Sequence, residues 1–170
     1  STNTYVQIAT AVLNTEKITF WGCLSSKSAV TTVTATFNSS RYGVAVSVYQ
    51  GVKGFSATNT NTATGSASPA TLTLNTALES GNWTLMGAVN KGTATWSASA
   101  PSNLRDNVPG AGTTTPGACI VDNTTTTAAA AESAGNVWAA TAVELQSAVN
   151  ITVSPTGSAI TSATTAPTVT

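Results

Sequence analysis

Apolar and polar residues alternate along most of this 170-residue chain, in runs that follow the two-residue period of a half-buried β-strand. The run over residues 43–50 is the clearest, because its valines fall on even positions and its small or aromatic residues on odd positions. The period of an amphipathic helix is nearly absent. Strands are predicted at residues 5–12, 18–24, 31–37, 43–50, 70–74, 83–90, 93–98, 118–121 and 137–146.

Turn-forming clusters of Gly, Pro, Asn and Ser separate these runs, for example at residues 51–54 and 65–69. Short strands with frequent turns predict an all-β fold of antiparallel strands, either a β-sandwich or a jelly roll. Residues 99–116 have little periodicity and are interpreted as a long surface loop. Residues 123–135 are expected to form a short helix or a strand, because Ala favours helix and Thr opposes it.

The chain has the length of one domain with a single core, which we place at residues 1–148. Residues 149–170 carry neither charge nor aromatic ring, and are interpreted as a Thr/Pro-rich C-terminal strand or tail. Residues 149–154 alternate cleanly and are expected to extend or pair beside 137–146. Pro155 then interrupts pairing, which leaves residues 159–170 to pair with a neighbouring subunit, with residues 1–12 as the alternative donor.

Charge is scarce and balanced, with six basic and six acidic residues and a net charge of zero. Hydrophobic residues make up 41% of the chain, so we expect folding rather than disorder. A net charge near zero favours contact between copies. The scattered basic residues form no stripe that could neutralise phosphates, and no apolar run reaches the length of a membrane span, so neither nucleic acid nor membrane is an expected partner.

Candidate chemistry is sparse. The chain contains no histidine, which removes the usual general base, the commonest metal ligand and the Ser-His and Cys-His nucleophile pairs. Two of the six dispersed carboxylates could face each other as in a glycosidase. This is a weak signal, because any six acidic residues allow such a pairing. Asp106 and Asp122 lack the spacing of a calcium loop and are interpreted as solvated charges. The sequence predicts a protein that is not an enzyme and that carries no cofactor or metal.

Cys23 and Cys119 are the two cysteines of the chain, and each lies in a predicted strand. A disulfide between them would close a loop of roughly a hundred residues and stabilise the fold by about 4–5 kcal/mol in the chain-entropy model. The alternative is two buried free thiols, because Cys also packs as a small apolar residue. The balance of the composition favours the disulfide.

The four tryptophans fall one to a predicted strand, at Trp21, Trp83, Trp96 and Trp138. Rings on an exposed face could stack on sugars, as in a carbohydrate-binding module, but a core poor in Phe and Leu needs Trp to fill volume. We expect core packing.

Four N-x-S/T sequons make Asn38, Asn82, Asn123 and Asn150 candidates for N-glycosylation. The alternative for each is an unmodified asparagine in a turn, since a Thr-rich chain produces sequons by chance.

The order and spacing of five segments resemble a Ser/Thr-rich β-sandwich domain of unassigned function, found in secreted and surface proteins of bacteria and archaea and in phage virion proteins. The segments are 3–6 (NTYV), 18–22 (ITFWG), 32–37 (TVTATF), 44–52 (VAVSVYQGV) and 138–145 (WAATAVEL). The resemblance implies a β-sandwich over residues 3–148 and transfers no catalytic residue. Such domains usually begin with a further hairpin, so we expect a sandwich that lacks its first hairpin and exposes strand edges.

The composition is also similar in style to archaeal thread and pilus subunits, which exchange donated strands. We therefore expect a structural subunit of an extracellular filament that polymerises with copies of itself by β-strand exchange, with N-glycans as candidate covalent partners. The alternatives are a capsid decoration protein of a phage or archaeal virus and a carbohydrate-binding module. The expected location is extracellular, on a cell surface or a virion surface.

Overall fold

The computed structural model describes residues 4–13, 16–24, 45–92, 94–110 and 116–148. These residues form ten strands and no helix, and every strand pairing is antiparallel. The predicted all-β antiparallel fold is confirmed. The finer jelly-roll assignment stays a prediction.

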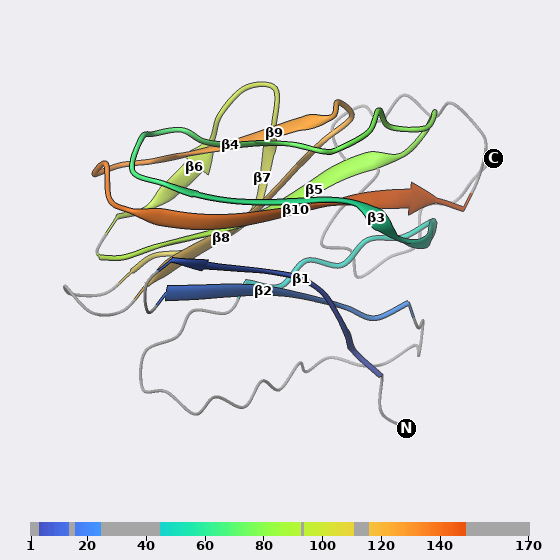
Figure 1. Ribbon diagram of the computed structural model, residues 1–170, viewed down its shortest axis with the longest axis horizontal. Helices are drawn as coiled ribbons and strands as arrows, with labels where there is room; N and C mark the ends of the chain where they lie inside the picture. Colours follow the sequence, from blue (N-terminus) through green and yellow to red (C-terminus); the bar gives the residue numbers. More distant parts are fainter. Residues whose placement is uncertain (1–3, 14–15, 25–44, 93, 111–115, 149–170) are drawn as a thin grey trace.

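The strands form three sheets that are stacked as layers (Figure 1). The central sheet has the order β3-β10-β5-β8-β7, with bounds Val52–Gly65, Trp138–Ser147, Trp83–Asn90, Gly117–Asn123 and Asn103–Val108. A three-stranded sheet of order β4-β9-β6 covers one face, with bounds Ala70–Thr73, Thr127–Glu132 and Trp96–Ala98. A hairpin of β1 (Val6–Leu13) and β2 (Glu16–Gly22) covers the opposite face.

The sandwich core lies between the central and three-stranded sheets. Met86 and Val121 are fully buried there, and Trp96 and Trp138 are buried in the same cluster. Alanines on the facing strands β9 and β10 let the two sheets approach closely around these large side chains. Gly65 is required beside Trp138, because a Cβ at this position would lie 2.6 Å from the indole Cζ2.

The second interface lies between the central sheet and an outer layer, which we define as the β1–β2 hairpin and residues 45–50. Ile8 and Phe20 from the hairpin and Tyr49 pack on buried residues of the central sheet such as Ile120. Gly87 makes room for Phe20, since a Cβ there would lie 2.9 Å from the ring Cζ.

Residues 45–50 are extended but are not assigned to a strand, so the strand predicted at 43–50 is not confirmed over its described part. The predicted alternation is nevertheless present: odd positions point inward, while Val46 and Val48 are exposed. Gly51, with φ of 69°, separates this segment from β3. The strand predicted at 31–37 lies outside the described residues.

Two sequence interpretations need correction, and one open alternative is decided. Residues 51–54 were expected to form a turn, but β3 begins at Val52 and pairs along β10, although its Thr, Asn and Ala residues show no apolar period. The expected loop at 99–116 contains β7, an edge strand whose polar side chains bond to neighbouring segments. Of the two alternatives for residues 123–135, helix or strand, the structure shows the strand: β9 pairs with β4 and β6, and this pairing outweighs the helix propensity of its alanines.

Candidate functional site

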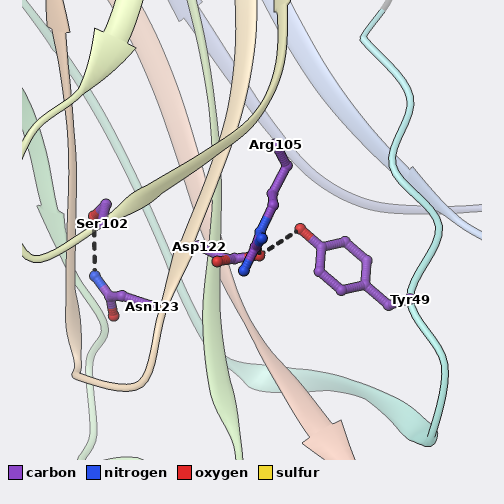
Figure 2. A network of polar contacts seen from close by, with 5 residues as sticks. All are labelled: Tyr49, Ser102, Arg105, Asp122 and Asn123. Carbon is purple, nitrogen blue, oxygen red and sulfur yellow. Dashed lines mark hydrogen bonds and ion pairs between the residues drawn. The ribbon is translucent and has the colours of Figure 1, made fainter. Parts of the chain in front are cut away.

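A buried ion pair joins the outer layer to the central sheet. Asp122 on β8 is fully buried, and its Oδ2 accepts hydrogen bonds from Arg105 Nε at 2.6 Å and from Tyr49 Oη at 2.9 Å. Figure 2 shows Tyr49 and Arg105 meeting at this carboxylate, while the adjacent Asn123 points to the other side of the strand toward Ser102. Asp122 is therefore not the solvated charge that the sequence suggested, because Arg105 compensates its burial.

The pKa shifts in this cluster support its role in attaching Tyr49 to β8. Burial and the neighbouring Asp122 carboxylate raise the pKa of Tyr49 far above its ordinary value, so the phenol stays a hydrogen-bond donor. Partial burial lowers the pKa of Arg105, but the hydrogen bond and the charge of Asp122 outweigh it and raise that pKa. Tyr49 therefore stays a neutral donor, and its hydrogen bond to Asp122 holds it against β8.

A second carboxylate holds the same segment. Asp106 Oδ2 accepts a hydrogen bond from the backbone N of Val46 at 2.7 Å, and its Oδ1 accepts one from the backbone N of Asn107 at 2.8 Å. Residues 45–50 are thus attached to the edge of the central sheet at Val46 and at Tyr49. Both attachments use carboxylates of β7 and β8, Asp106 and Asp122, which were interpreted from the sequence as solvated charges.

Two further carboxylates are buried on the sandwich side of the central sheet. Glu144 accepts hydrogen bonds from Asn82 Nδ2 at 2.7 Å and from Asn59 Nδ2 at 2.9 Å. Glu132 accepts one from Asn90 Nδ2 at 2.7 Å. Neutral amide donors replace water around both groups, so these clusters stabilise the ends of the sandwich core.

No three acidic or cysteine side chains in the described segments lie close enough together to hold a metal ion. The buried carboxylates are engaged with amides, with a guanidinium or with backbone groups. Their chemistry is that of structural attachment: they join strands that are distant in the sequence.

The two cysteines are free thiols, so the predicted disulfide is not formed. Cys119 lies in the sandwich core with Ala88 and Trp96, whereas Cys23 follows β2 in the outer layer on the opposite side of the central sheet. The sheet itself therefore separates the two sulfur atoms. Burial raises the pKa of Cys119 to about 12, which keeps it protonated and unreactive.

Two of the glycosylation candidates, Asn82 and Asn123, are buried. The amide nitrogen of Asn82 is bonded to Glu144, and that of Asn123 is bonded to Ser102 at 3.0 Å, and both residues are buried. Neither nitrogen is accessible for a glycan in the folded protein. Asn38 and Asn150 lie outside the described residues and stay candidates.

The tryptophans do not share a face. Trp96 and Trp138 are buried and donate from their indole nitrogens to the carbonyls of Gly117 and Ala67. Trp83 is half-buried, and Trp21 is 56% exposed on the outer face of the hairpin. The core-packing prediction is confirmed for Trp96 and Trp138, and the four rings do not form a coplanar platform.

Exposed apolar side chains are concentrated on one layer. Of the nine large hydrophobic residues that are exposed in the described ranges, seven lie on or beside the outer layer, and two, Leu104 and Val137, lie on or beside the central sheet. The seven are Tyr5, Val6, Val12, Trp21, Leu24, Val46 and Val48. The alternation of apolar and polar residues could not locate this surface, because it did not show which faces of the predicted strands would be exposed in the folded protein.

Comparisons of the chain with models of protein families, with curated proteins and with solved structures give no match. The described residues contain no helix of the length and apolarity needed to cross a membrane.

Proposed function

We propose that this chain is a non-enzymatic structural subunit that polymerises with copies of itself into an extracellular filament. The observation that carries the proposal is the outer layer, which concentrates seven exposed apolar side chains on one side of a sandwich. Apolar surface gathered in this way is typical of a protein–protein contact. A net charge of zero adds no electrostatic repulsion between copies.

Strand exchange is the proposed mode of assembly, with the C-terminal residues after Pro155 as donor. This segment is uncharged and rich in β-branched residues, which suits a strand added to a sheet edge. The N-terminal alternative is disfavoured, because Val6 to Leu13 already pair with β2 of the same chain. The donor itself lies outside the described residues.

The test is the mass and shape of the full chain in solution. We expect sedimentation velocity to show species that grow with concentration and negative-stain microscopy to show filaments. Ile160→Pro should abolish this growth, because proline removes a ladder donor, whereas Thr156→Pro, beside the existing Pro155, should not. A chain that stays monomeric over the accessible concentrations would refute the proposal.

The capsid-decoration alternative would use the same apolar surface, and it would give closed oligomers of one size instead of filaments. The carbohydrate-binding alternative gains no support from the tryptophans, of which Trp21 is the one with a largely exposed side chain. An extracellular or virion-surface location, with N-glycans at Asn38 or Asn150, belongs to the same proposal.

A further inference from the structure

Side chains bond some of the backbone groups at the two sides of the sandwich. At the β3–β4 side, Asn61 Nδ2 donates to the carbonyl of Thr73 at 2.7 Å, and Asn59 Oδ1 accepts from the backbone N of Thr76 at 2.9 Å. At the β6–β7 side, Asn107 Oδ1 accepts from the backbone N of Trp96 at 3.3 Å. Asparagine side chains thus occupy three backbone groups that a donated strand could otherwise use.

The outer layer offers a different edge. Residues 45–50 have the extended alternation of a strand but pair with no other strand in the described parts of the chain. Val46 and Val48 project outward with 42% and 51% of their surfaces exposed. We call residues 45–50 the acceptor segment.

The acceptor segment is held in place before any partner arrives. Val46 N is bonded to Asp106, and Tyr49 Oη is bonded to the buried Asp122. These two attachments, three residues apart, fix the backbone of the acceptor segment. A pairing strand would therefore not have to order this segment. Preorganisation of this kind favours strand addition over other modes of contact.

The remaining chain has the length and character of an occupant. Residues 149–170 follow Ala148, whose backbone N donates to the carbonyl of Gly51 at 2.7 Å. At roughly 3.3 Å per residue, these 22 residues (170 minus 148) can span about 70 Å, against about 46 Å for the 14-residue β3. The tail is therefore long enough to reach beyond its own subunit.

The geometry near Gly51 favours a partner from another copy. β10 stays in the central sheet to Ser147, whereas the positive φ of Gly51 directs residues 45–50 into the outer layer over β8. The end of β10 and the acceptor segment of the same copy therefore lie in different layers.

We propose that the acceptor segment of one copy binds residues 159–170 of a second copy as an added β-strand. The proposal rests on the proposed function and specifies which edge receives the donated strand. Outward valines would pack beside the β-branched residues of the donor, and the uncharged donor would meet no buried charge without a partner.

The test uses two chains with one accessible cysteine each, in a Cys23→Ser background where Cys119 stays buried. A Val48→Cys chain and a Thr168→Cys chain are mixed under assembling conditions and treated with a short bismaleimide crosslinker. Val137→Cys replaces Val48→Cys in the matched control, because Val137 is also exposed but lies beside the central sheet. Val46→Cys provides a second acceptor position if Val48→Cys impairs folding.

We expect the mixed dimer to form roughly tenfold faster with the Val48→Cys or Val46→Cys chain than with the control, because strand addition raises the local thiol concentration. Equal rates in a sample that still polymerises would overturn the acceptor assignment and leave the proposed function intact. A doubly substituted chain that crosslinks within itself when dilute and monomeric would also overturn it. Failure of the unsubstituted chain to polymerise would overturn both proposals.

Discussion

The two faces of the central sheet differ in the strands that cover them and in how many of their buried polar atoms lack a hydrogen-bond partner. The face toward β4, β9 and β6 buries both core tryptophans, and its carboxylates are held by asparagines. The face toward the outer layer is covered by a two-stranded hairpin and an extended segment, and it retains three of the four buried polar atoms that lack a hydrogen-bond partner in the described parts of the chain. Those three are Ser47 Oγ, Asp122 Oδ1 and Thr141 Oγ1.

The difference predicts that the sandwich contributes more to stability than the outer layer does. A two-stranded hairpin is marginal by itself and depends on the sheet beneath it. A layer with exposed apolar side chains has more to gain from a new contact than a sealed core does. Substitutions on the two faces should therefore have unequal effects on the same fold.

The largest effect is expected from truncating a core tryptophan. Trp96→Ala should lower the free energy of unfolding by about 3–5 kcal/mol, because it leaves a cavity in the sandwich and removes the bond to the Gly117 carbonyl. Phe20→Ala, in the outer layer, should cost only about 1–2 kcal/mol since its ring is half-buried. Urea titration of both variants measures the free energy of unfolding. Equal losses in the two variants would contradict the interpretation that the sandwich face contributes more to stability than the outer-layer face.

The next effect concerns the carboxylate at the end of the sandwich core. Glu144→Gln should destabilise by about 2–3 kcal/mol, because its new NH₂ would face the Asn59 or Asn82 amide nitrogen. Neither asparagine can flip in response, since Thr76 N and Ser147 N already bond to their oxygens. Glu79→Gln is the control. The Glu79 side chain is exposed, so the unfolding midpoint of this variant should differ little from that of the unsubstituted protein.

Alkaline pH should weaken the sandwich through Cys119. Its pKa is raised from 9.0 to about 12, so the folded state keeps a proton that the unfolded chain releases. The associated stability is fully present below pH 9 and is lost as the pH rises toward 12. The loss in the free energy of unfolding should reach about 2 kcal/mol by pH 10.5. Unfolding of Cys119→Ala should show a shallower alkaline slope than Cys23→Ala. Identical slopes would show that the thiol is not linked to folding.

The smallest effect should be confined to one layer. Gly87→Ala places a Cβ against the Phe20 ring and should cost about 1–2 kcal/mol, mainly by loosening the hairpin. Gly65→Ala makes the corresponding change against Trp138 on the other face. Hydrogen exchange should rise in β1 and β2 for the first variant and in β3 and β10 for the second. Uniform exchange in both would mean that the layers unfold together.

The alternation of apolar and polar residues was sufficient to predict most strands and the antiparallel all-β class. It failed at β3, whose Thr, Asn and Ala residues have no apolar period, and at β7, where Arg105, Asp106 and Asn107 look like a loop. Both are edge strands of the central sheet, and their side chains serve the sheet by bonding to neighbours. Patterning cannot detect a strand whose stabilisation comes from its partners.

The attachment of residues 45–50 could be predicted only in part. The sequence indicated that Ala45, Ser47 and Tyr49 would share a face, and they do. It did not indicate that the tyrosine would meet Asp122 or that Val46 would bond to Asp106, because these partners lie 73 and 60 residues away along the chain. Contacts of such separation depend on strand order, which a period of two does not contain.

What the sequence determined by itself was local: the alternation that makes strands, the low charge that leaves no repulsion between copies, and the absence of histidine. The tertiary structure decided everything that depends on which side of a sheet a residue faces. It separated Cys23 from Cys119 and buried the amides of Asn82 and Asn123. It also left Trp21 exposed while burying Trp96, because side-chain direction is local but the presence of a covering layer is not.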